Sequence, residues 1–268
     1  MDFGSIQPFV AHVPSANLRI PFRKLAKLHP AQIADLVEEA SHEEGEEIIA
    51  AVGFDHELEA DVFEELDQSH RLEFLATRSD DDASQLLSRM QPDDAADLVS
   101  TIDPARRTNI LDRLPEPQLT KVRRLLTYSS TTAGGLMSTE FLTIRNDTTV
   151  ASALEAARRS TIPGESLHAF FVTNENQQVV GIASIAELVR AQPSELLENI
   201  VRGTIKYARP DWPLHRIALV MSDFNLTVLP VVNDENFEMI GVITVDDLLN
   251  ALLPQGWRRE FGMGAVEE

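Results

Sequence analysis

The sequence contains no cysteine and no long apolar run. Without cysteine, the 268-residue chain can form neither a disulfide nor a thiolate metal site. A transmembrane helix needs about 20 consecutive apolar residues, and the longest apolar runs here extend over only a few positions. The first residues also lack a basic tip followed by an apolar core, so we expect no export signal. These absences predict a cytoplasmic chain without direct membrane insertion.

Basic residues are nearly missing from one long acidic stretch. Between Pro30 and Pro104 there are 22 Asp and Glu residues against three arginines, so this stretch carries nearly all of the net charge of −20. A field of that sign repels a phosphate backbone, and we expect no nucleic-acid partner. The stretch either attracts cations or forms a solvated acidic surface, and composition alone leaves both interpretations open.

Common signatures of catalysis are also absent. The sequence has no Gly-rich phosphate loop, no Gly-x-Ser-x-Gly nucleophile motif and no His-x-x-x-His pair. Adjacent carboxylates such as Asp93 and Asp94 have no identifiable partner group for acid–base work. We therefore expect that the chain is not an enzyme.

The acidic stretch has the pattern of many short helices. From Leu28 to about Tyr128, helix starts recur about every 12–13 residues, and most open on a capping residue: Ser41, Asp55, Asp67, Ser79 and Asp103. An apolar pair follows most starts: Leu36-Val37, Ile48-Ile49, Phe74-Leu75, Leu86-Leu87, Leu98-Val99 and Ile110-Leu111. Helices of eight to ten residues are not stable alone, so residues 24–130 are predicted to form an α-superhelix.

The C-terminal half contains a strand-to-helix joint twice. In Gly181–Val189 and Gly241–Leu249, a glycine and two apolar residues precede a hydroxyl N-cap, Ser184 or Thr244. An acid follows three positions later, Glu187 in the first copy and Asp247 in the second. Each copy is predicted to run strand, helix, strand, strand, helix. In the first copy these elements are 141–144, 150–160, 169–173, 179–183 and 185–190, and the second copy has their counterparts up to Leu253.

This repeated unit resembles the tandem CBS domain. CBS domains share the β-α-β-β-α unit and its Gly-apolar-apolar-hydroxyl joint, and Leu229–Val232 is typical as well. More narrowly, Thr132–Phe141 and Thr227–Val232, with the helical segments Leu28–Val37 and Met90–Val99, are similar to the cytosolic region of MgtE-type magnesium transporters. That family places an acidic helical N domain before a CBS pair. The resemblance implies a multi-domain α and α/β fold and a Mg²⁺-sensing regulatory function without a pore in this chain.

The resemblance also implies a set of metal ligands. The family's Mg²⁺ positions fall on Asp61, Asp93, Asp97, the Gly135 carbonyl and Asp247, between the N domain and the CBS pair. Asp93 and Asp97 are four residues apart, so one helix presents both carboxylates on the same face. Two further family aspartates are Asn225 and Asn250 here, which weakens the sites that would couple the CBS domains to a pore.

Nucleotide binding is the competing use of a CBS pair. The resemblance places AMP or ATP at the two joints, on Ser184 with Glu187 and on Thr244 with Asp247, where a helix N-terminus favours phosphate. Glu187 replaces the more usual aspartate, and Lys206 and Arg209 are the nearest basic residues in the sequence.

Four regions follow from these patterns. Residues 1–23 form an extended arm, either the tail of a PRC-barrel-like domain or a loosely docked segment; residues 24–130 form the helical domain; residues 131–254 form the CBS pair, divided near 195; and residues 255–268 form a tail. Three functions remain open: a Mg²⁺ sensor acting with a membrane transporter, an adenine-nucleotide sensor, and a protein-docking scaffold. A homodimer through the CBS pair is expected in each, because Leu248, Leu249, Leu252 and Leu253 make an apolar helix edge.

Overall fold

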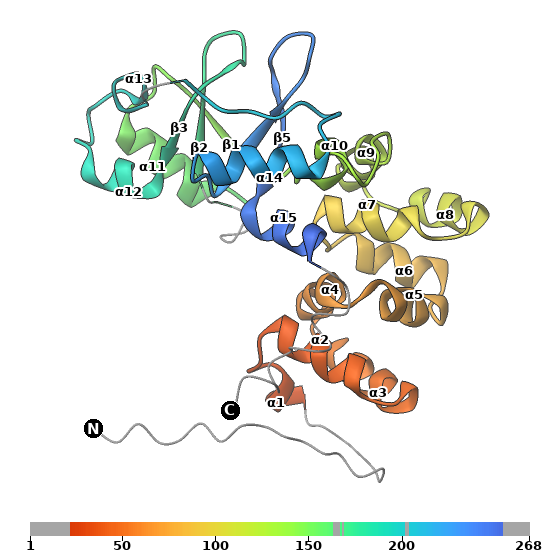
Figure 1. Ribbon diagram of the computed structural model, residues 1–268. Helices are drawn as coiled ribbons and strands as arrows, with labels where there is room; N and C mark the ends of the chain where they lie inside the picture. Colours follow the sequence, from red (N-terminus) through yellow and green to blue (C-terminus); the bar gives the residue numbers. More distant parts are fainter. Residues whose placement is uncertain (1–21, 163–166, 168, 202–203, 254–268) are drawn as a thin grey trace, which may run out of the picture. The chain divides into compact units, whose positions relative to one another are not determined.

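A computed structural model describes residues 22–162, 167, 169–201 and 204–253 (Figure 1). Nearly all of the predicted N-terminal arm and the whole C-terminal tail lie outside these residues. The chain divides into two compact units. The first runs to Met90 and adds Thr101–Leu114 and the residues from Leu253, and the second comprises Gln91–Ser100 and Pro115–Leu252.

The first unit consists of short helices. They are α1 (Phe22–Leu25), α2 (Pro30–Glu39), α3 (His42–Val52), α4 (His56–Glu65), α5 (Gln68–Ala76), α6 (Asp80–Leu87) and α8 (Pro104–Leu111). Alternate helices stack, α2 on α4, α4 on α6 and α6 on α8, while α3 packs against both α2 and α4. Each short helix thus buries its apolar face against neighbours, as its length requires.

The predicted caps of these helices are confirmed. Ser41, Asp55, Asp67, Ser79 and Asp103 each accept a hydrogen bond from a main-chain amide in the first turn of the helix that follows. The predicted apolar pairs are buried in both units with one exception, Leu36, which is only partly buried. Caps and apolar spacing therefore determine where these helices begin and which side faces inward.

One arginine ties three segments of the first unit together. Arg106 of α8 donates to the main-chain carbonyls of Leu75 and Arg78, at 2.9 and 2.8 Å, and to the carboxylate of Asp80 at 3.2 Å. These bonds supply a donor to the Arg78 carbonyl, in the connection between α5 and α6, and a further donor to the Leu75 carbonyl, which also accepts from the Arg78 amide at 3.2 Å.

The second unit holds two helices of the predicted helical domain, α7 (Pro92–Ser100) and α9 (Gln118–Leu125), and the two repeats. Its other elements are α10 (Ala133–Leu136), β1 (Leu142–Arg145), α11 (Val150–Arg159), β2 (Ala169–Thr173), β3 (Val179–Ser184), α12 (Ile185–Arg190), α13 (Leu197–Ile200), α14 (Leu214–Asp223), β4 (Val228–Val232), β5 (Met239–Thr244) and α15 (Val245–Leu252). In the first repeat β1 pairs parallel with β2, and β2 pairs antiparallel with β3. The predicted fold class, short helices followed by a CBS pair, is confirmed.

The second repeat departs from the predicted order, because its first strand is missing from the described residues. Only Ala208 pairs with β4: it donates to the Pro230 carbonyl at 2.8 Å and accepts from Val232 at 3.0 Å. The next parallel ladder bonds would need the main-chain N–H of Pro230 on one side and of Pro210 on the other. Proline has no such donor, so the pairing stops at one residue and the second sheet keeps two strands, β4 and β5.

The two repeats are related by an approximate two-fold arrangement. The isolated bridges Thr132 to Pro213 and Thr149 to Leu196 exchange equivalent positions of the two copies, which are 64 residues apart in this part of the repeat. Near the joints the copies are 60 residues apart, and Gln178 pairs with its own equivalent, Glu238. The two sheets share a core that includes Phe171 of β2 and Val228 of β4. Each repeat therefore covers the apolar face that the other leaves open.

The repeated glycines serve this arrangement. A Cβ on Gly181 would lie 2.3 Å from the Cβ of Val201, and one on Gly241 would lie 2.5 Å from the sulfur of Met137. Val201 and Met137 are themselves equivalent positions, at the ends of the short helices α13 and α10. Met137 precedes the first repeat and contacts the glycine of the second, whereas Val201 precedes the second repeat and contacts the glycine of the first. The glycines are needed for this close approach.

Among the described residues, no helix has the length and apolar character that crossing a bilayer requires.

Candidate functional site

The candidate site is centred on Asp93, in the first turn of α7. Its Oδ1 atom is buried and has no hydrogen-bond partner within the described part of the chain. Burial raises the pKa of Asp93 well above its ordinary value, and the nearby carboxylates of Asp94 and Asp247 raise it further. A hydrogen bond with the Ser138 side chain opposes the shift only partly. A carboxylate in this setting is costly unless a positive charge offsets it.

Asp247 reaches the same region from the second strand-to-helix joint. Its amide donates to the Thr244 hydroxyl at 3.3 Å, and that hydroxyl donates to Asp247 Oδ2. Thr244 is buried and Asp247 is partly buried. Asp247 therefore helps to cap α15 and at the same time places a negative charge beside Asp93.

The third predicted ligand, the Gly135 carbonyl, belongs to α10. This short helix packs against α7, which carries Asp93, and against α15, which carries Asp247 (Figure 1). A Cβ on Gly135 would lie 2.2 Å from the main-chain oxygen of Ser129, so only glycine fits there. Carboxylates and a carbonyl are the oxygen donors that a hard divalent cation such as Mg²⁺ prefers, and an unpartnered buried carboxylate oxygen fits such an ion.

The other predicted ligands have different surroundings. Asp97, one turn after Asp93 on α7, is exposed. Asp61 is exposed on α4 and belongs to the first unit, whereas Asp93 belongs to the second. Asn225 adopts a left-handed backbone conformation with φ of 50°, and Asn250 is exposed on α15. Of the predicted ligands, the described contacts thus bring together Asp93, Asp247 and the helix that carries Gly135.

Two residues near Asp93 were not predicted as part of a site. Ser138 is buried and pairs through its main chain with Val242 of β5, at 2.8 and 2.9 Å, which fixes its side chain beside Asp93. Asp94 adds a second negative charge. The Asp93-Asp94 pair is visible in the sequence, but the approach of Ser138 depends on the pairing of segments that are far apart in the chain.

The first strand-to-helix joint is closed by its own hydrogen bonds. Glu187 Oε2 accepts from the Ser184 amide and hydroxyl, each at 2.8 Å, and the Glu187 amide donates to Ser184 Oγ at 3.2 Å. This is a capping box, so both predicted nucleotide contacts serve the start of α12. Lys206 Nζ lies 4.0 Å from the centre of the Phe224 ring, and Arg209 pairs with Asp234 and lies over Phe237. The two basic candidates are thus engaged within the chain.

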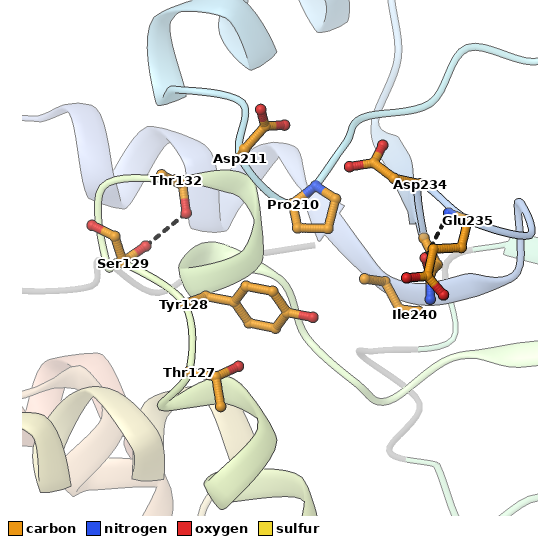
Figure 2. A pocket seen from close by; sticks show the side chains of 10 residues that line it. Thr127, Tyr128, Ser129, Thr132, Pro210, Asp211, Asp234, Glu235 and Ile240 are labelled. Carbon is orange, nitrogen blue, oxygen red and sulfur yellow. Dashed lines mark hydrogen bonds between the residues drawn. The ribbon is translucent and has the colours of Figure 1, made fainter.

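A pocket of about 500 Å³ lies elsewhere in the second unit (Figure 2). Figure 2 shows the ring of Tyr128 extending toward the side formed by Ile240, Asp234 and Glu235. Asp211 adds a third carboxylate, and the residues found to line the pocket include neither Lys nor Arg. A lining of this kind does not favour phosphate, and none of the predicted site residues contributes to it.

Comparison with protein families places a boundary just before the first of the two repeats. Residues 28–131 match the family described as the MgtE intracellular N domain. Residues 133–194 and 197–254 each match the CBS domain.

Individual relatives agree with these matches. The magnesium transporter MgtE of Thermus thermophilus is 32% identical over 147 residues, which are 55% of this chain and 32% of that protein. The magnesium transporter MgtE of Bacillus subtilis is 23% identical over 216 residues, 72% of this chain and 48% of that protein. A crystal structure of the cytosolic domain of the Mg²⁺ channel MgtE in complex with ATP superposes with a TM-score of 0.79 at 28% identity, covering 86% of this chain and 93% of that one. The chain thus spans about a third to a half of the length of these curated relatives.

Proposed function

Because the chain comprises an MgtE intracellular N domain followed by two CBS domains, we propose that it is a cytosolic Mg²⁺-sensing regulatory module of magnesium transport. In this proposal Mg²⁺ bridges acidic faces between the domains and controls their spacing. The module acts on a membrane transporter and performs no catalysis itself.

The observation that supports the proposal is the buried, unpartnered Oδ1 of Asp93. Asp93 belongs to the family's N domain, whereas Asp247, which raises its pKa, belongs to the second CBS domain. The two carboxylates repel each other without a cation. Asp93, Asp247 and the Gly135 carbonyl would hold the ion, Asp97 would extend the acidic surface around it, and Asp61 would contribute the fifth ligand that the resemblance implies. Bound Mg²⁺ supplies the positive charge that this arrangement lacks.

The positions of these residues explain how Mg²⁺ binding at Asp93 would change the spacing of the domains. Asp93 is fixed to α7, and Asp247 to the start of α15 through the Thr244 cap. Ser138, which hydrogen-bonds Asp93, is held on β5 by two main-chain bonds. When the carboxylates repel, α7 is pushed from the CBS pair. When the repulsion is offset, α7 is held against it and the helical domain is drawn with it.

Thermal unfolding in a Mg²⁺ titration at fixed ionic strength tests this proposal, since constant ionic strength separates specific binding from screening. We expect Mg²⁺ to raise the Tm of the wild-type chain and to leave the Asp93→Asn, Asp97→Asn double variant unchanged. An equal rise in both proteins would refute the assignment of the site.

Nucleotide sensing is a second candidate, supported by the ATP that is named for the related cytosolic domain. AMP or ATP would bind at Ser184 and Glu187 or at Thr244 and Asp247, where it competes with the capping bonds described above. Binding of AMP in the presence of EDTA tests this use separately from Mg²⁺. A wild-type Tm that AMP does not shift would exclude AMP as the ligand at these joints.

We also propose that the CBS pair forms a homodimer. Leu248 of the predicted apolar edge is buried within its own unit and does not contribute, but Leu249 and Leu252 are 51% and 46% exposed. Helix α14 contacts α15 (Figure 1) and exposes Leu219 at 61%. Burial of this surface against a second copy would remove it from water. Sedimentation should therefore report a dimer that Leu249→Glu dissociates, and a wild-type monomer would contradict the proposal.

A further inference from the structure

Three side chains with metal-ligating atoms converge in the first unit, away from the site described above. Glu38 of α2, Asp67 at the N-cap of α5 and His70 of α5 each place a ligand atom within 4.8 Å of the other two. His70 Nδ1 lies 3.0 Å from Asp67 Oδ1, and the Asp67 amide donates to Glu38 Oε1 at 2.6 Å. The side chains of His70 and Asp67 are 21% and 26% exposed, and Glu38 is half-buried.

Capping explains only part of this cluster. Asp67 Oδ1 caps α5 by accepting from the His70 amide at 2.9 Å and from the Ser69 hydroxyl at 2.6 Å, and any residue with a side-chain acceptor at position 38 could receive the Asp67 amide. A carboxylate at position 38 instead adds a second negative charge next to Asp67. Burial, and then the charges of Asp67 and Asp35, raise the pKa of Glu38 above its ordinary value. A cation between the carboxylates would offset both effects.

We propose that Glu38, Asp67 and His70 bind one divalent transition-metal ion of the Zn²⁺ type. Imidazole nitrogen with carboxylate oxygen is a donor set that suits Zn²⁺, whereas Mg²⁺ prefers oxygen alone. Three protein ligands leave a fourth position of a tetrahedral ion for water. The ion would join α2 to the start of α5, which the long-range hydrogen bond from the Asp67 amide to Glu38 already links.

His42 provides a matched comparison on the same unit. His42 and His70 both stack on Phe74, with ring centroids 6.0 and 6.3 Å away. His42 also contacts two carboxylates, but through different ring nitrogens: Nδ1 lies 2.7 Å from Glu73, and Nε2 lies 3.6 Å from Glu46. The two nitrogens of one imidazole point in different directions, so one ion cannot reach both carboxylates and the ring. The geometry therefore assigns the metal to His70 and not to His42.

Isothermal titration of the zinc-free 268-residue chain with ZnCl₂ tests the proposal. Saturating Mg²⁺ in the buffer keeps the proposed site at Asp93 filled. A failure of Zn²⁺ to bind at Glu38, Asp67 and His70 is then distinguishable from a failure of the magnesium proposal. The variants are Glu38→Gln, His70→Asn and, as the control, His42→Asn. The amide side chain in Glu38→Gln retains an oxygen that accepts from the Asp67 amide, so this variant removes a ligand without removing the link to α5. Circular dichroism in EDTA verifies that each variant is folded.

We expect one Zn²⁺ per chain, a weakening of at least about tenfold in Glu38→Gln and His70→Asn, and wild-type affinity in His42→Asn. X-ray absorption of the zinc-loaded wild type should show one imidazole nitrogen among oxygen ligands. Failure of the wild type to bind Zn²⁺ would overturn the proposal. So would unchanged affinity in folded Glu38→Gln, or an equal loss in His42→Asn and His70→Asn.

Discussion

Replacing Asp93 by asparagine should stabilise the metal-free protein. Asparagine has nearly the same shape as aspartate but no charge, so it removes the repulsion from Asp94 and Asp247 and the cost of burying an anion. Its amide can donate to the neighbouring carboxylates, and its oxygen can still accept from Ser138. An unpartnered buried polar group typically costs about 1–3 kcal/mol, and more when charged. We therefore expect Asp93→Asn to raise the free energy of unfolding by an amount of that order in EDTA.

The assay is urea unfolding in EDTA, repeated in Mg²⁺ at the same ionic strength. A gain of 1 kcal/mol corresponds to a Tm increase of about 2–4 °C for a unit of this size, so calorimetry provides an independent measure. Asp97→Asn is the control, because Asp97 is exposed on the same helix and its replacement should change the EDTA value little. In Mg²⁺ the order should reverse, since only the wild type gains from the ion. A variant that is less stable than the wild type in EDTA would refute the reasoning.

Three further predictions concern pH, packing and one polar link. In EDTA, the wild type should be less stable than Asp93→Asn by an amount that depends on pH. The difference should be absent below about pH 3.8, the ordinary pKa of the aspartate, should grow as the pH rises toward the higher pKa of folded Asp93, and should stay constant above it. A difference independent of pH would contradict this. Gly181→Ala should cost about 1–3 kcal/mol in urea unfolding, because its Cβ would overlap the Cβ of Val201, and adding Val201→Gly, which removes that Cβ, should restore part of the loss. Arg106→Ala should cost about 1–3 kcal/mol, because it removes the donor to the Arg78 carbonyl and the bond to the Asp80 carboxylate; a thermal melt equal to that of the wild type would show that water replaces the guanidinium.

Local patterns in the sequence predicted most of the helices. Capping residues such as Ser41 and Asp67 act within one turn of the chain, so their effect is readable from neighbouring residues. The repeated joints were readable for the same reason. The shortened second sheet was not predicted, although Pro210 and Pro230 are plain in the sequence. Their effect appears only when the register is known, because the two ladder bonds that they remove lie between segments about 20 residues apart.

The candidate site was only partly predictable. The family resemblance named Asp93 and Asp247 together with three other ligands, but it could not rank them. The structure separates them by burial, since Asp93 has a buried carboxylate oxygen while Asp97 and Asp61 are exposed. Ser138 and the cluster of Glu38 with Asp67 and His70 escaped prediction because helices and strands distant in the sequence bring their side chains together.

Small-angle scattering of the purified chain during a Mg²⁺ titration at fixed ionic strength tests the central claim most directly, because it reports the spacing of the domains. The wild type should show a decrease in radius of gyration at millimolar Mg²⁺, and the Asp93→Asn, Asp97→Asn double variant should show none. A radius of gyration that stays constant in the wild type, or that falls equally in both proteins, would contradict a Mg²⁺ sensor built on Asp93.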